Sequence, residues 1–227
     1  MGAVSTCSIR PRGARWIYVV GHGAGAGMRH PFLEEISSRL AARRIATFRY
    51  QFPYMEAGRK RPDHARILQA TVRAAIARVR YDSDLPLIAG GKSMGGRMTS
   101  LALASAGEPG VMGLAFLGFP LHPAKKSASV RGEHLPAIDL PMLFLQGTRD
   151  DLADLERMRV LARSLGPRAT LHVVDGADHA FHVLVRSGRT DDQVLDELAD
   201  TLAAWGERIL DVPGGPDRPT RPGKARS

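Results

Sequence analysis

The chain of 227 residues has little cysteine, few aromatic side chains and no long apolar run. Its single cysteine, Cys7, cannot form a disulfide within the chain, so nothing indicates an oxidising compartment. The N-terminal segment carries arginines but no apolar stretch of signal-peptide length, and no run approaches the roughly 20 apolar residues that span a bilayer. We therefore expect a cytoplasmic protein without a membrane partner.

The sequence also lacks the pattern by which proteins bind single-stranded nucleic acid. Its net charge of +9 would suit a nucleic-acid partner. However, aromatic residues make up only 6% of the chain, and they are not interleaved with the basic residues, which are spread over expected helices. We expect a solvated, arginine-rich surface and no nucleic acid as partner. Strongly salt-dependent DNA binding would be the sign of the alternative.

Two glycine-rich segments do not fit the phosphate-binding motifs that they superficially resemble. A P-loop needs a glycine five residues before Gly91 of Gly-Lys-Ser, and that position is Pro86. The cluster that starts at Gly21 lacks the acidic residue that a dinucleotide site needs at the end of the second strand, where residues 48–50 read Phe-Arg-Tyr. No histidine–carboxylate cluster has metal-ligand spacing. We expect neither a cofactor nor a metal.

Short apolar segments rich in β-forming residues alternate with helical patterns along most of the chain. Strands are expected at about residues 15–21, 44–50, 85–90, 111–118, 140–147 and 168–174. Helices are expected at 31–43, 63–80 with Asp63 as its cap, 94–106, 154–165 and 191–210. This alternation predicts a three-layer α/β fold, in which helices cover both faces of a mainly parallel, open sheet of about six strands.

The length of the chain allows one well-cored domain and little more. We expect that domain at residues 15–210, after an N-terminal extension of residues 1–14. Residues 211–227 are proline, glycine and arginine with nothing to bury, which predicts a disordered tail. About twenty residues separate the strand that ends near Gly118 from the strand that begins near Pro141, too few for a large lid domain.

The segment Gly91-Lys92-Ser93-Met94-Gly95 joins an apolar strand to a helix and matches the G-x-S-x-G turn that exposes a catalytic serine. Side chains two residues either side of the serine would collide with their neighbours, and the two glycines remove those side chains. Ser93 would then lie at a helix N-terminus, where the dipole and free N–H groups favour a developing oxyanion. The structural alternative is a glycine-rich turn whose serine merely caps the helix.

A serine is a weak nucleophile unless a base activates it and an acid orients the base. Asp150 follows one expected strand and His179 follows the next, at the edge of a parallel sheet where catalytic residues collect. The chain order serine, aspartate, histidine is also the order expected after a G-x-S-x-G turn. The weaker alternatives are Asp151 and Asp154 for the acid, and His22, His172 and His182 for the base.

Six segments together resemble the α/β-hydrolase superfamily, in its small dienelactone-hydrolase-like branch. They are HGAGAGM at 22–28, RYQFPY at 49–54, GGKSMGGRM at 90–98, GFPLHP at 118–123, LFLQGTRD at 143–150 and ADHAFHVLVRSGR at 177–189. Within that branch, the chain is most similar to a group of bacterial hydrolase-like proteins, a testis-expressed vertebrate protein and a subunit of the non-specific lethal chromatin complex. The resemblance covers nearly all of residues 15–205.

The resemblance implies an acyl-transfer enzyme with Ser93 as nucleophile, Asp150 as acid and His179 as base. It also implies an oxyanion hole made by backbone N–H groups, which are those of Met94 and of Gly23 or Ala24. Dienelactone hydrolases proper carry cysteine at the nucleophile position, so Ser93 departs from them. That departure leaves the acyl-transfer chemistry in place but not their substrate.

The function that these residues predict is hydrolysis of a small carboxylic ester or thioester through an acyl-enzyme. Without a large lid we expect an open site and short to medium acyl chains. The side chains expected to line the site are His22, Tyr50, Tyr54, Lys92 and His122. Lys92 would attract an acidic substrate or face solvent, and His122 would touch substrate or form a structural turn. The alternative function is a catalytically idle scaffold that binds a protein partner, and the oligomeric state stays open.

Overall fold

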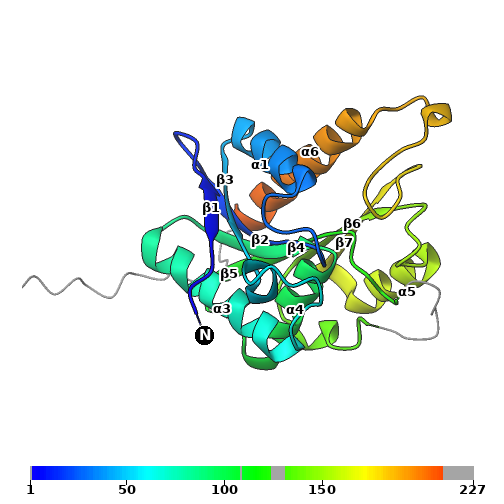
Figure 1. The fold of residues 1–227 in the computed structure, drawn as a ribbon. Coiled ribbons are helices and arrows are strands. Elements are labelled where there is room, and N and C mark those ends of the chain that lie inside the picture. The colour runs from blue at the N-terminus through cyan, green and yellow to red at the C-terminus, as the bar shows by residue number, and fades with distance from the viewer. Residues whose placement is uncertain (1, 108, 124–130, 212–227) are drawn as a thin grey trace, which may run out of the picture.

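Seven strands form one sheet in the order β1-β3-β2-β4-β5-β6-β7 (Figure 1). The computed structural model describes residues 2–107, 109–123 and 131–211. The strands are β1 Thr6–Ile9, β2 Trp16–Gly21, β3 Ile45–Tyr50, β4 Leu87–Lys92, β5 Val111–Leu117, β6 Met142–Gly147 and β7 Ala169–Val174. All neighbouring strands are parallel except β1, which runs antiparallel to β3. The predicted α/β fold with a mainly parallel sheet is therefore confirmed.

Helices cover both faces of this sheet, with α1 and α6 on one face and α3, α4 and α5 on the other (Figure 1). The helices are α1 Pro31–Ala42, α2 Pro53–Glu56, α3 Ala65–Asp82, α4 Met94–Ala106, α5 Leu155–Leu165 and α6 Asp191–Leu210. The connection from β2 through α1 to β3 runs across the sheet in the direction opposite to all later connections. Because strand–helix–strand crossovers are right-handed, that reversal places α1 on the face opposite α3, α4 and α5.

The residues of β2 contribute to the hydrophobic cores on both faces of the sheet. All six of its residues are buried. Side chains alternate between faces, so Ile17 and Val19 pack with α3, α4 and α5, whereas Trp16, Tyr18 and Val20 pack with α1 and α6. A strand covered on both faces is apolar throughout instead of alternating, which is the pattern that identified it.

The chain also forms elements that the sequence did not predict. β1 lies within the expected N-terminal extension and adds a seventh strand, and α2 lies in an expected loop. α3 begins at Ala65 with His64 as its N-cap residue, so the expected cap at Asp63 is wrong. The carboxylate of Asp63 instead pairs with Arg59 at 2.7 Å. The expected tail, apart from residue 211, lies outside the described residues.

The strand order reverses between β2 and β4, because β2 connects to β3 on one side and β4 connects to β5 on the other. Open α/β sheets bind their ligands at the carboxyl ends of strands at such a point. Gly21 at the end of β2 is paired with Gly91 of β4. The glycine-rich segments that follow these two strands therefore leave the sheet side by side. Only residues 118–141 separate β5 from β6, and the part of this segment that the structure describes forms no large lid domain.

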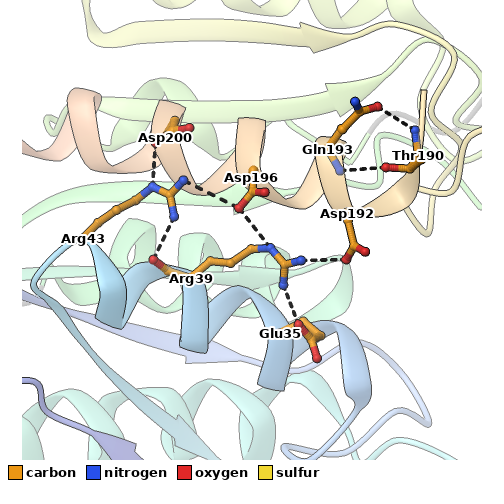
Figure 2. A network of polar contacts seen from close by, with 8 residues as sticks. All are labelled: Glu35, Arg39, Arg43, Thr190, Asp192, Gln193, Asp196 and Asp200. Atoms are coloured by element: carbon orange, nitrogen blue, oxygen red, sulfur yellow. Dashed lines mark hydrogen bonds and ion pairs between the residues drawn. The ribbon is translucent and has the colours of Figure 1, made fainter. Parts of the chain in front are cut away.

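A ladder of ion pairs joins α1 to α6 on the surface of the molecule (Figure 2). The guanidinium groups of Arg39 and Arg43 contribute the positive charges, and both side chains are largely covered. Their carboxylate partners are Glu35, Asp192, Asp196 and Asp200. α6 begins with a capping box between Thr190 and Gln193. The ladder thus connects the helices that follow two loops of the candidate site described next.

Candidate active site

The turn around Ser93 places the serine in a backbone conformation that side-chain-bearing residues rarely adopt, with φ 50° and ψ −114°. Its N–H donates to the carbonyl of Leu117 in β5 at 3.1 Å. A Cβ atom added at Gly91 would lie 2.4 Å from the carbonyl oxygen of Gly21, and one added at Gly95 would lie 2.2 Å from the same oxygen. The collisions predicted for these two positions are therefore confirmed, and they explain why glycine stands at both.

Ser93, His179 and Asp150 form one hydrogen-bonded chain. The Ser93 Oγ lies 2.9 Å from His179 Nε2, and His179 Nδ1 lies 2.7 Å from Asp150 Oδ2. Since a carboxylate only accepts, Nδ1–H donates to Asp150 and leaves Nε2 to accept the hydroxyl proton. The Asp150 side chain is fully buried, whereas the His179 side chain keeps 22% of its surface exposed. This arrangement can activate the hydroxyl for attack on a carbonyl carbon.

The weaker candidates for acid and base lie away from this chain. Asp154 caps α5, where its carboxylate accepts the N–H of Arg157 at 2.9 Å. Asp151 is exposed. The imidazoles of His172 and His182 bond to carboxylates of α6, at 2.7 Å and 2.8 Å respectively. Their partners on α6 account for these two side chains without any contact to Ser93.

A glutamine that the sequence analysis missed holds the carboxylate of Asp150. Gln146 in β6 is fully buried, and its Nε2 donates to Asp150 Oδ2 at 2.5 Å. Its Oε1 accepts the N–H of Phe119 at 3.0 Å, which fixes the orientation of the amide. Asp150 Oδ1 accepts the N–H of Leu152 at 2.8 Å. The one signal in the sequence was an amide side chain inside an otherwise apolar strand.

Three backbone N–H groups near Ser93 are available to an oxyanion. Within the described part of the chain, those of Gly23, Ala24 and Met94 donate to no protein oxygen or nitrogen. Gly23 faces the nucleophile, since a Cβ atom added there would lie 3.9 Å from Ser93 Cβ. Met94 is the first residue of α4, where the helix dipole adds to the effect of the free donor. These groups are suited to receive negative charge beside the serine.

Residues after β3 hold the loop that carries Gly23. His22 is fully buried, and its Nδ1–H donates to the Gly23 carbonyl at 2.7 Å while Nε2 accepts the N–H of Phe52 at 3.1 Å. Burial lowers the pKa of His22, against an opposing effect of the Gly23 carbonyl, and so favours the neutral ring that Nε2 needs in order to accept. The hydroxyl of Tyr54 accepts the N–H of Gly25 at 2.9 Å. The segment RYQFPY thus braces this loop.

The side chains expected to line an open site are mostly enclosed. Tyr50 and Tyr54 are fully buried, so they support the site from within instead of bordering it. His22 is buried as well. His122 is 6% exposed and its Nε2 accepts the N–H of Asp154 at 3.2 Å, which makes it part of a structural turn. Lys92 directs its ammonium group to the backbone carbonyl of His179, in the segment 175–190 between β7 and α6, which we call the His179 loop.

Metal and membrane features were sought in the same part of the chain. Across residues 2–107, 109–123 and 131–211, no group of three or more His, Cys, Asp or Glu residues could hold a metal ion. None of the helices in these ranges is long and apolar enough to cross a bilayer. The candidate site therefore consists of the hydrogen-bonded chain and the backbone donors beside it.

A mainly parallel sheet with a serine on the turn after β4, an aspartate after β6 and a histidine after β7 is the architecture of α/β-hydrolases. A family model described as an alpha/beta hydrolase domain matches residues 14–207. Because that match spans most of the chain, the protein belongs to the alpha/beta hydrolase domain family.

Solved structures of three bacterial proteins share the fold. TT1662 from Thermus thermophilus superposes with a TM-score of 0.70 at 18% identity, over 92% of this chain and 95% of that one. A dienelactone hydrolase from Anabaena variabilis gives 0.71 at 19% identity, over 90% and 91%. XC6422 from Xanthomonas campestris, described as an a/b serine hydrolase without lid, gives 0.69 at 18% identity, over 89% of each chain. At these identities the likeness concerns the fold.

Proposed function

We propose that the protein is a serine hydrolase that cleaves carboxylic esters or thioesters through an acyl-enzyme on Ser93. The observation that carries this proposal is the chain of two hydrogen bonds, 2.7 Å from Asp150 to His179 and 2.9 Å from His179 to Ser93. A glycine-rich turn with an incidental serine would have no reason to face a histidine that is itself held by a buried carboxylate. The family match and the free N–H groups beside the serine support the same chemistry.

The proposed reaction begins when Ser93 Oγ attacks the carbonyl carbon and His179 Nε2 takes the hydroxyl proton. The oxyanion accepts hydrogen bonds from the N–H groups of Met94 and of Gly23 or Ala24. His179 then returns its proton to the leaving alcohol or thiol, and an acyl-enzyme remains. Water attacks the acyl-enzyme with His179 again as base, releasing the acid and restoring the serine.

We further propose small esters of short to medium acyl length as substrates, because the segment between β5 and β6 is too short for a lid that would cover a long chain. XC6422, whose fold is similar, is described as lacking a lid. Hydrolysis rates are then expected to fall as the acyl chain lengthens. The cytoplasmic location, the absence of membrane and nucleic-acid partners, and membership of the group with the testis-expressed and chromatin-complex proteins are proposals from the sequence alone.

The first test is labelling with a fluorophosphonate, which reacts only with activated serines, followed by mass mapping of the labelled peptide. The label is expected on Ser93 and should be lost in Ser93→Ala. His179→Ala should label far more slowly, and ester hydrolysis by Ser93→Ala should fall at least ~10³-fold in kcat. Ser38→Ala, which removes an exposed hydroxyl on α1, should label normally. Wild-type protein that is folded but unlabelled would contradict the proposal and favour the idle scaffold.

A further inference from the structure

Lys92 directly precedes the proposed nucleophile. The sequence analysis expected its side chain to attract an acidic substrate or to face solvent, and the structure shows neither. The residue keeps part of its surface, but its ammonium group is enclosed. Nζ donates to the backbone carbonyl of His179 at 2.5 Å, across 87 positions of sequence. It therefore connects the last residue of β4 to the loop that carries the proposed base.

Two aromatic rings complete the surroundings of this ammonium group. Nζ lies 5.8 Å from the ring centroid of Phe32 in α1 and 5.3 Å from that of Phe181 in the His179 loop. The two rings stack with their centroids 5.7 Å apart. A cation near aromatic faces is stabilised by their negative charge distribution, most strongly when water is excluded. Lys92 thus fastens the loop through both a main-chain carbonyl and the Phe181 side chain.

The enclosed charge has no carboxylate within ion-pair distance among the described residues. Burial lowers the pKa of Lys92 to about 8, against the opposing effects of the more distant Asp150 and Asp178. Enclosing a cation without a close anion costs free energy unless other contacts offset the lost hydration. An aliphatic side chain would fill the same space at lower cost, so stability alone does not account for a lysine here.

The ammonium group also lies close to the imidazole. The position that a Cβ atom of Gly118 would occupy is 3.0 Å from Lys92 Nζ and 3.5 Å from both Cε1 and Nδ1 of His179. Glycine leaves this space open between them. Phe181 has φ 65°, a strained value for a residue with a side chain, so the loop needs contacts that hold it in this shape.

Resting on the proposed function, we propose that Lys92 is a positioning residue for His179. It ties the loop that carries the base to the strand of the nucleophile, through the carbonyl of His179 and the ring of Phe181. The other groups that face the imidazole are the Asp150 carboxylate after β6 and the Ser93 hydroxyl, with Asp178 adjacent in the loop. His182 belongs to the same loop but its imidazole bonds to Asp191. From α1 the facing group is the uncharged ring of Phe32.

The test compares full-length Lys92→Met and Lys92→Arg with wild type by the rate of fluorophosphonate labelling at Ser93 from pH 5 to 9. Lys92→Met is expected to label about tenfold more slowly at pH 8, because the loop loses its tether. The loss should lie in the rate of the labelling step and not in the affinity for the fluorophosphonate, because Lys92 acts on the position of the base and not on the ligand. Lys92→Arg keeps a cationic donor for the His179 carbonyl, so it should restore most of the labelling rate.

Thermal unfolding separates this effect from misfolding. Lys92→Met should not unfold at a much lower temperature than wild type at pH 7, because it removes an unpaired buried charge. The folded-state pKa of Lys92 is lowered from 10.5 to about 8. The unfolded chain therefore binds more protons between those values, and wild-type stability should rise with pH across that window, a rise that Lys92→Met lacks. Lys60→Met removes the same charge from an exposed position and should match wild type throughout.

Two outcomes would overturn the proposal. Labelling of Lys92→Met at the wild-type rate, or equally slow labelling of Lys92→Met and Lys92→Arg in protein shown to be folded, would show that Lys92 does not act through His179. In both cases wild-type labelling at Ser93 leaves the hydrolase function standing. Absence of labelling in the wild type would overturn the hydrolase function and this proposal together.

Discussion

The turn that carries Ser93 and the loop that carries His179 meet in one hydrogen-bonded chain but are held by different physical means. At the turn, backbone packs directly on backbone. Cβ atoms at Gly91 and Gly95 would approach the Gly21 carbonyl oxygen to 2.4 Å and 2.2 Å. The conformation of Ser93 depends on the absence of side chains at these two positions, of which Gly91 lies in β4 and Gly95 in the first turn of α4.

The His179 loop depends on partners that are distant in sequence. The carbonyl of Ala177 accepts the N–H of Arg149 at 2.9 Å, and the hydroxyl of Thr148 accepts the N–H of Gly176 at 2.8 Å. Lys92 holds the carbonyl of His179. Atoms added to the turn should therefore destroy it, whereas the loop should weaken stepwise as partners are removed. Mutations can test that difference directly.

The largest effect is expected from Gly95→Ala. The new methyl group would lie within 2.2 Å of the Gly21 carbonyl oxygen, so β2 and α4 cannot keep their present separation. Overpacking of this kind costs about 3 kcal/mol or more, which corresponds to a fall of roughly 6–12 °C in unfolding temperature for a domain of this size. Labelling at Ser93 should be lost as well. Thermal unfolding and labelling of the same preparation measure both.

Gly23→Ala is the matched control for that variant. The nearest atoms to a Cβ atom at Gly23 are 3.8 Å away, an ordinary contact distance. Gly23→Ala should therefore unfold near the wild-type temperature. If Gly95→Ala also did so and kept its label, direct backbone packing could not be what shapes the turn.

A smaller effect is expected from Gln146→Glu, in which the Asp150 carboxylate loses its buried hydrogen-bond donor. The new carboxylate would face Asp150 Oδ2, where Gln146 Nε2 now donates at 2.5 Å. Loss of a hydrogen bond to a charged group costs about 1.5–3 kcal/mol, so labelling at pH 8 should slow roughly 10- to 100-fold. Burial and the neighbouring carboxylate raise the pKa of an introduced glutamate. Its protonated form can donate again, so the deficit should shrink as pH falls.

Two further variants are the controls for the pH dependence of Gln146→Glu. Gln146→Met can neither donate nor titrate, and its deficit should stay constant as pH falls. Gln69→Glu makes the same change on α3, away from the site, and should label as wild type. Equal pH profiles for Gln146→Glu and Gln146→Met would contradict a role through the Asp150 carboxylate and indicate only a packing role.

Elements with strong local signals were predicted with their observed bounds. α4 begins at the residue after the turn serine and α6 begins at a capping box, so both agree with the expected ranges. β1 escaped prediction because it has four residues and buries little, and its place in the sheet comes from pairing with β3. The start of α3 was misplaced because Asp63 pairs with Arg59, and His64 takes the N-cap position in its place.

The residues of the candidate site also differ in whether the sequence alone could indicate them. Ser93, Asp150 and His179 could be proposed because each lies in the segment after a strand whose apolar run is visible in the sequence. The direction of a side chain at the end of a strand, or in the short helix after it, has no such signal. Tyr50 at the end of β3 and Tyr54 in α2 were therefore expected at an open surface, although both are buried. Gln146 was missed for a related reason. Its partners lie in two other segments, and only the folded sheet brings them together.

The smallest effect is expected at the ladder between α1 and α6 (Figure 2). Asp196 contacts Arg39 at 3.2 Å and Arg43 at 3.7 Å. Because the Asp196 side chain is 55% exposed, Asp196→Asn should cost only about 0.5–1 kcal/mol and about 2–3 °C, and ~1 M salt should erase the difference. The control is Asp139→Asn, at an exposed carboxylate without an ion pair in the described part of the chain. It should change neither the unfolding temperature nor the effect of salt on it.

Labelling of Ser93 should be unaffected by Asp196→Asn, and that result would sharpen the comparison between turn and loop. α6 follows the His179 loop directly, so a loop held mainly by its helix would lose its shape when the ladder weakens. A loop held by direct contacts to Lys92 and to the segment after β6 would keep its shape. Slower labelling of Asp196→Asn at unchanged pH would therefore show that the position of His179 also depends on how α6 docks on α1.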